Sequence, residues 1–208
     1  AFYRVVTDSL GKATINDLEY GKYEIVELKT VEGYVLNEEP ITFEVKENNK
    51  DIEIEISNKP IEGYIEINKV DEDTGRKLKD AKFEVWNKFR TLVTVLTTDE
   101  NGYAKTEKLP YGVYYVKEQE SPDGYRLNED NIETVEISEE GQVHVLNITN
   151  KRQEGILQFS KTDIATGEVI EGATIEIKGL DEINKDIYIK FVSSKEGNVF
   201  TLPVGKYE

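Results

Sequence analysis

The stretch YIEINKVDED, residues 64–73, opens with a strict alternation of apolar and polar side chains. Successive side chains of a β-strand point to opposite faces, so Ile65, Ile67 and Lys69 share one face. The two isoleucines mark this face as the one that packs into a core, where a charged lysine is costly to bury. The stretch therefore predicts a β-strand whose core face ends in a lysine.

The same pattern recurs along the chain. KVDEDTGRKLKDAKFEV, which starts at Lys69, matches KTDIATGEVIEGATIEI, which starts at Lys161. TDSLGKATINDLEYGKYEIVE, which starts at Thr7, likewise matches TDENGYAKTEKLPYGVYYVKE, which starts at Thr98. Self-similarity at a period of roughly 90 residues predicts tandem copies of one structural unit.

The repeat divides the chain into three modules. We expect a module at residues 1–60 that lacks its first strands, a complete module at 61–152, and a module at 153–208 that lacks its last strands. The joints NKPIEG and NKRQEG are short and contain no Gly/Ser tract, so we expect limited bending between modules. The opening AFYRVV is abrupt, as if the chain continued a longer protein.

Each module is predicted to be all-β. Short alternating runs rich in Val, Ile, Tyr, Phe and Thr are separated by turn signals such as DEDTG, DENG and SPDG. About seven short strands in a unit of this size are typical of a two-sheet sandwich of immunoglobulin-like architecture. The chain has no cysteine, which excludes the inter-sheet disulfide of antibody domains.

Composition excludes several classes of function. The 208 residues carry a formal net charge of −16, which argues against binding nucleic acid or an anionic membrane surface. No apolar run is long enough to cross a bilayer, so we expect no membrane insertion in this segment. With a single histidine, His144, and no cysteine, we expect no metal site and no cofactor.

Two more strands of the complete module carry a polar residue on their apolar face. In GVYYVKEQE, Glu118 follows Tyr114 and Val116 on one face, and in VHVLNITN, Asn150 follows Ile148. Each of these side chains alone has a simpler interpretation, since a strand-end Glu usually lies on the rim and an Asn usually caps a turn. A strand-end lysine likewise usually extends to water.

The incomplete modules repeat this arrangement, which weakens the simpler interpretation. Glu27 ends the apolar face of KYEIVE, Asn58 ends that of DIEIEISN, and Lys161 ends that of ILQFSK. The first module thus has the Glu and the Asn, and the third has the Lys.

A Lys, a Glu and an Asn in one apolar core are the components of an amide-forming reaction. Desolvation disfavours charge, so a buried lysine tends toward the nucleophilic neutral amine and a buried Glu toward the neutral acid. The protonated Glu can hydrogen-bond the Asn carbonyl and move protons between the amine and the leaving group. We expect a Lys–Asn isopeptide bond, formed once per module with loss of one ammonia, so the protein is not a turnover enzyme.

Three sequence signatures resemble one known family. The opening KVDEDTGRKLKDAKFEVW is similar to the first strand of collagen-adhesin B-type (Cna-B) repeats of Gram-positive surface adhesins and pilins. YYVKEQESPDGY resembles the pilin E-box, with Ser121 in place of the usual Ala, and NITNK resembles the closing strand. The resemblance implies these site residues: Lys69 and Asn150 as the bonded pair with Glu118 as the assisting acid, Glu27 and Asn58 in the matching roles of the first module, and Lys161 as the reactive lysine of the third.

The resemblance implies an extracellular, cell-wall-attached stalk or pilin-type module whose partners are the neighbouring modules of the same protein. One alternative is a ligand-binding adhesin module for a host extracellular-matrix protein or a glycan. Another is an accessory β-domain of an extracellular enzyme. A head-to-tail assembly, in which Lys161 of one chain meets Glu27 and Asn58 of another, also remains open.

Overall fold

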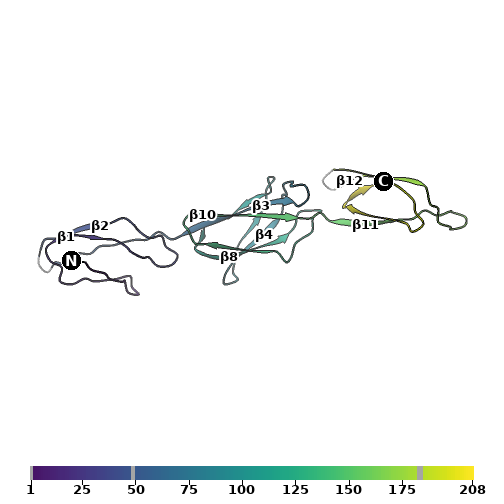
Figure 1. The fold of residues 1–208 in the computed structure, drawn as a ribbon. Helices are drawn as coiled ribbons and strands as arrows, with labels where there is room; N and C mark the ends of the chain where they lie inside the picture. Colours follow the sequence, from purple (N-terminus) through teal and green to yellow (C-terminus); the bar gives the residue numbers. More distant parts are fainter. Residues whose placement is uncertain (1, 48–49, 182–184) are drawn as a thin grey trace.

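The computed structural model describes residues 2–47, 50–181 and 185–208. These residues form strands and turns without a helix, so the described chain holds no helix that could cross a membrane. The strands pair into five sheets, which lie in three bodies arranged in a row, with the chain ends in the outer bodies (Figure 1). The all-β prediction is confirmed.

The middle body is a two-sheet sandwich. One sheet has the strand order β10-β3-β6, with β7 also paired to β3, and the other has the order β5-β4-β8-β9. The strands are β3 (Glu62–Asp71), β4 (Lys82–Asn87), β5 (Leu92–Thr97), β6 (Tyr103–Lys105), β7 (Leu109–Pro110), β8 (Gly112–Glu120), β9 (Ile132–Ile137) and β10 (Gln142–Asn150).

β3 and β10 are the first and last strands of the middle body, and they lie side by side in parallel. Their register pairs Lys69 with Ile148 and Asp71 with Asn150. Every second residue of β3 is buried, as the alternation in its sequence predicts. Two parallel neighbours need a long connection between them. In this body the connection from β3 to β10 contains all the other strands, β4 to β9.

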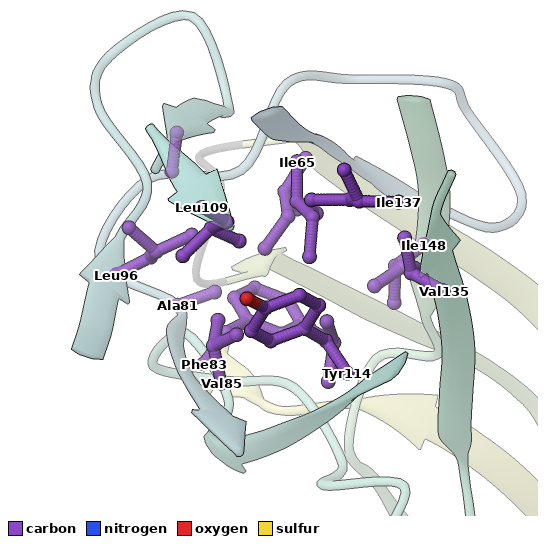
Figure 2. Close-up of a cluster of buried hydrophobic side chains, with 13 residues drawn as sticks. Ile65, Ala81, Phe83, Val85, Leu96, Leu109, Tyr114, Val135, Ile137 and Ile148 are labelled. Atoms are coloured by element: carbon purple, nitrogen blue, oxygen red, sulfur yellow. The ribbon is translucent and has the colours of Figure 1, made fainter. Parts of the chain in front are cut away.

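The core lies between the two sheets of the middle body, as Figure 2 shows. Outside residues 61–152, the described chain buries only two hydrophobic side chains, Ile177 and Leu202, so the middle body alone has an extensive core. The buried cluster consists of Ile65, Ile67, Ala81, Phe83, Val85, Leu96, Ala104, Leu109, Tyr114, Val116, Val135, Ile137 and Ile148.

The outer bodies contain smaller sheets. The first body has one antiparallel pair, and the third has a three-stranded sheet of order β13-β12-β15 and the pair β11-β14. Their strands are β1 (Gly21–Ile25), β2 (Ile41–Val45), β11 (Glu154–Phe159), β12 (Thr174–Asp181), β13 (Asp186–Val192), β14 (Asn198–Pro203) and β15 (Gly205–Tyr207).

One predicted strand does not form. The alternation of DIEIEISN, residues 51–58, predicts a strand, but this segment belongs to none of the sheets of the described chain. Its repeat counterpart β10 is a strand because it pairs with β3, and no described segment takes the place of β3 beside residues 51–58. Backbone groups need a neighbouring strand as their partner, so alternation alone is not sufficient.

A tyrosine contact shows that the three bodies share local structure. In the related sequences LEYGKY, LPYGVY and LPVGKY, the last tyrosine is Tyr23, Tyr114 or Tyr207. Each phenol donates a hydrogen bond to the backbone carbonyl four residues earlier, at 2.8, 2.7 and 2.6 Å respectively. The turn before each of these tyrosines therefore has the same construction in every body, in agreement with the internal repeat.

Removing a core ring should destabilise the middle body strongly. Phe83 is fully buried, so Phe83→Ala should lower the free energy of unfolding by about 3–5 kcal/mol. Phe89 is 77% exposed, and Phe89→Ala should change it by less than about 0.5 kcal/mol. Denaturant unfolding followed by the fluorescence of Trp86, the single tryptophan, measures both. Similar losses for the two variants would contradict this placement of the core.

Candidate functional site

Three polar side chains meet inside the middle body. Lys69 comes from β3, Asn150 from the neighbouring β10, and Glu118 from β8 in the opposite sheet. Their exposed fractions are 0%, 3% and 3% respectively. The structure therefore brings together, in a water-excluded position between the sheets, the three residues that the sequence suggested for the complete module.

The carboxylate of Glu118 contacts both of the other side chains. Its Oε1 lies 3.6 Å from Nζ of Lys69, an ion pair too long for a hydrogen bond, and its Oε2 accepts a 2.8 Å hydrogen bond from Nδ2 of Asn150. Nζ of Lys69, Oε1 of Glu118 and Oδ1 of Asn150 are buried without any hydrogen-bond partner. The expected hydrogen bond from Glu118 to the Asn150 carbonyl is not formed, because the amide nitrogen faces the carboxylate.

Burial shifts both titrating groups toward their neutral forms. Desolvation lowers the pKa of Lys69 to about 8, although the nearby Glu118 carboxylate acts in the opposite direction. Desolvation also raises the pKa of Glu118, against the effects of Asn150 and Lys69. Both shifts favour an uncharged amine beside an uncharged acid.

Backbone contacts hold these side chains in place. The amide of Lys69 donates to the carbonyl of Gly102 at 2.7 Å, and the carbonyl of Lys69 accepts from Leu78 at 3.0 Å. Gly102 has a φ of +65°, and a Cβ atom there would overlap the carbonyl oxygen of Lys69. This supporting role of Gly102 was not predicted, although a glycine at the same position of the matched turns DSLG and DENG was a usable signal.

The first body contains a similar Glu–Asn pair. Nδ2 of Asn58 donates to Oε2 of Glu27 at 2.6 Å, and both residues are half-buried. The backbone amide of Asn37 also donates to Oε2 of Glu27, at 2.7 Å. Among the described residues, Glu27 forms no ion pair with a lysine.

The third body presents its lysine without partners of this kind. Lys161 is half-buried, and its carbonyl accepts a hydrogen bond from Ile170 at 2.8 Å. In the part of the chain that the structure describes, its side chain pairs with neither a Glu nor an Asn. The described residues also contain no group of three or more His, Cys, Asp or Glu side chains placed to hold a metal ion.

One protein-family model matches most of the chain. This model, described as the SpaA prealbumin-like fold domain, matches residues 2–60 and 63–152. The two matched ranges include the Glu–Asn pair of the first body and all three buried polar residues of the middle body.

Individual relatives come from Gram-positive bacteria. A structure of the Bacillus anthracis TIE protein aligns with 97% of this chain at a TM-score of 0.83 and 34% identity. The trypsin-resistant surface T6 protein of Streptococcus pyogenes serotype M6 is 38% identical over 74 residues, 36% of this chain. BcpA, the major pilin subunit of Bacillus cereus, aligns with 68% of this chain and 57% of its own at 13% identity and a TM-score of 0.46. The chain spans only 38% of the first relative and 13% of the second.

Substituting Gly102 should disturb the backbone of Lys69. Gly75→Ala, at a φ of +70° with open space around the added Cβ, should cost about 1–2 kcal/mol of stability from backbone strain alone. Gly102→Ala should cost clearly more, because it adds an overlap with the Lys69 carbonyl. Denaturant unfolding monitored at Trp86 compares the two variants. Equal losses of stability would show that Gly102 is needed only for its positive φ and not for its close approach to Lys69.

Proposed function

The chain belongs to the family of SpaA prealbumin-like fold domains, and on this premise we propose that it is a stalk or pilin-type segment of a bacterial surface protein. Its middle body is closed by a Lys69–Asn150 isopeptide bond that the fold makes on itself. The three bodies correspond to modules with boundaries near 1–60, 61–152 and 153–208. The segment lies outside the cell, attached to the cell wall through parts of the parent protein beyond it.

The observation that carries this proposal is the set of unpartnered atoms at the site. Native proteins rarely bury a polar atom without a hydrogen bond, yet Lys69, Glu118 and Asn150 each have one. These atoms are the nucleophile, one oxygen of the proton carrier and the carbonyl oxygen that amide formation requires. Such a cluster destabilises the unreacted core, so it supports a chemical role over a purely structural one.

The reaction follows from the contacts of the two carboxyl oxygens. Neutral Nζ of Lys69 attacks Cγ of Asn150 and forms the new C–N bond, while a proton of the amine passes to Oε1 of Glu118, the oxygen facing Nζ. The proton that Glu118 carries at the start lies on Oε2, the oxygen that faces Nδ2. Once Nζ has added to Cγ, Oε2 gives this proton to Nδ2 and the C–Nδ2 bond breaks. The products are one secondary amide and one ammonia, and Glu118 is again a neutral acid, with its proton now on Oε1.

The site supplies this chemistry by position and dryness. Holding the amine and the amide in contact converts a bimolecular reaction into a unimolecular one. Exclusion of water keeps the amine neutral and prevents hydrolysis of the amide.

The bond would protect the module against unfolding. It would close a loop of roughly 80 residues between Lys69 and Asn150, which by analogy with disulfides stabilises by about 4–5 kcal/mol. It would also tie the first strand to the last, so pulling on the two ends of the module could not separate β3 from β10. A covalent amide, unlike a disulfide, resists reducing agents.

The same roles extend to the outer modules. Glu27 and Asn58 would be the assisting acid and the bond-forming amide of the first module, and their hydrogen bond repeats that of Glu118 and Asn150. Lys161 would be the reactive lysine of the third. Within this chain neither outer module has all three groups, so we expect one bond per chain.

Intact mass measured under denaturing conditions tests the bond. The chain should be one ammonia lighter than its sequence, and a digest should contain a branched peptide joining Lys69 to Asn150. Lys69→Ala and Glu118→Ala should each restore the full mass, because they remove the nucleophile and the proton carrier. Lys117→Ala, which changes the adjacent residue on the opposite face of β8, should keep the deficit. An unmodified mass for the parent chain would rule the bond out.

The rate of bond formation should depend on pH in a bell shape. The reactive form carries one proton, on Glu118, so the rate should fall above about pH 8, where the pair loses that proton. It should fall again below the raised pKa of Glu118, where Lys69 is also protonated. The chain is kept unfolded during isolation and is then diluted into refolding buffers from about pH 4 to 10. Mass measurements at successive times give the rate of ammonia loss at each pH. A rate that rises steadily through pH 10 would contradict the role of Glu118 as an acid.

A further inference from the structure

One linker residue, Ile61, forms backbone hydrogen bonds to both the first and the middle body. The amide of Ile61 donates to the carbonyl of Gly33 in the first body at 2.8 Å. The carbonyl of Ile61 accepts from the amide of Tyr111 in the middle body at 2.9 Å. The backbone of one residue is thus hydrogen-bonded to both bodies.

The joint between the middle and third bodies repeats this backbone arrangement. Gln153 donates to the carbonyl of Gly124 at 2.7 Å and accepts from the amide of Val204 at 2.9 Å. Gly33 and Gly124 occupy matching positions in the turns EGY and DGY of the repeat. Both joints are therefore built on the same backbone pattern, and differences between them come from side chains.

The second joint contains a buried ionic cluster that spans both bodies. Nη1 of Arg152 lies 2.6 Å from Oδ2 of Asp181 in the third body, and its Nε lies 3.4 Å from Oδ2 of Asp71 in the middle body. The hydroxyl of Tyr125 donates to the same oxygen of Asp71 at 2.8 Å. Asp71, Asp181 and Tyr125 are 1%, 3% and 3% exposed, and the Arg152 side chain is 14% exposed. We call these four residues the joint cluster.

Charge makes the arginine essential to this cluster. Two carboxylates from different bodies face one guanidinium, whose planar fork can bind both at once. Without that cation the two buried carboxylates would repel each other, and breaking a buried ion pair by removing one partner is strongly unfavourable. Arg152 can therefore pair with both carboxylates at once only while the third body keeps its orientation relative to the middle body.

The first joint has no equivalent of this arginine. Its matching residue is Pro60, which has no charge and forms an isolated β-bridge with Tyr34. Side-chain contacts at this joint lie at the surface, between Lys59 and Glu140 and between Tyr111 and Glu32. Exposed pairs of this kind contribute little to stability.

We infer that Arg152 locks the third body to the middle body in one orientation. Both joints share the same backbone hydrogen bonds, and the ion pairs of Arg152 are an addition found at the second joint. The lock goes beyond the proposed cross-link, since none of its four residues takes part in amide formation. It makes this pair of modules a single rigid segment.

Distance distributions between spin labels test the lock in the full chain. The chain lacks cysteine, so cysteines introduced at the exposed positions Thr97 and Lys195 can be labelled selectively, one on each side of the joint. Pulsed electron–electron double resonance should give a narrow distribution of label-to-label distances for the parent chain. Arg152→Gln should broaden it and add distances absent from the parent.

A matched control comes from another arginine at the same joint. Arg126 pairs with Glu154 across the joint at 3.4 Å, but both side chains are about half exposed, so Arg126→Gln should leave the distribution narrow. Asp181→Asn should broaden it as Arg152→Gln does, because it removes the other end of the bridge. It provides a second test if Arg152→Gln folds poorly. Unfolding at Trp86 shows whether the middle body of each variant folds, and circular dichroism of the full chain shows whether the β-structure of the third body is kept. An unchanged distribution in folded Arg152→Gln and Asp181→Asn, or equal broadening in Arg126→Gln, would overturn the inference.

Discussion

Exclusion of water around Lys69 is the constraint on which the rest of the site depends. In water, an amine and a carboxylic acid ionise and neither attacks nor assists. Between the two sheets, desolvation lowers the pKa of Lys69 and raises that of Glu118, and the ion pair they form leaves one atom of each unpartnered. Conversion of the amine and the amide into one secondary amide would leave the core without a lysine that can become charged. The cost of burial and the driving force for reaction thus have the same origin.

The first body separates the contribution of the Glu–Asn contact from that of the lysine. Glu27 and Asn58 are hydrogen-bonded at 2.6 Å although no described lysine is paired with them, and Glu118 and Asn150 form the same bond at 2.8 Å beside Lys69. The contact therefore forms without a lysine beside it, and in the first body it forms although neither residue lies in a strand. On this view the fold positions acid and amide first, and the lysine strand completes the site.

Alternation predicted the core faces of Lys69, Glu118 and Asn150 because the two-residue period of a strand is independent of tertiary structure. Applied two residues further, it would also have placed Asp71 in the core. It failed for residues 51–58, because a strand needs a neighbour that a local pattern cannot supply. The contact between Gly102 and Lys69 and the bridge from Arg152 to Asp181 join segments distant in sequence, so no local period reveals them. Which oxygen of Glu118 faces which partner likewise follows only from packing.

The parallel pairing of β3 with β10 has a consequence for how such modules add up. The first and last strands of the middle body run in the same direction, so the chain enters the body at one end and leaves at the other. Each copy then behaves as a directed step, and successive copies extend the same line, as the row in Figure 1 does. An antiparallel pair would return the chain to its starting end and fold the next copy back alongside. The direction of one strand pair thus decides whether repetition of this unit gains length or only thickness.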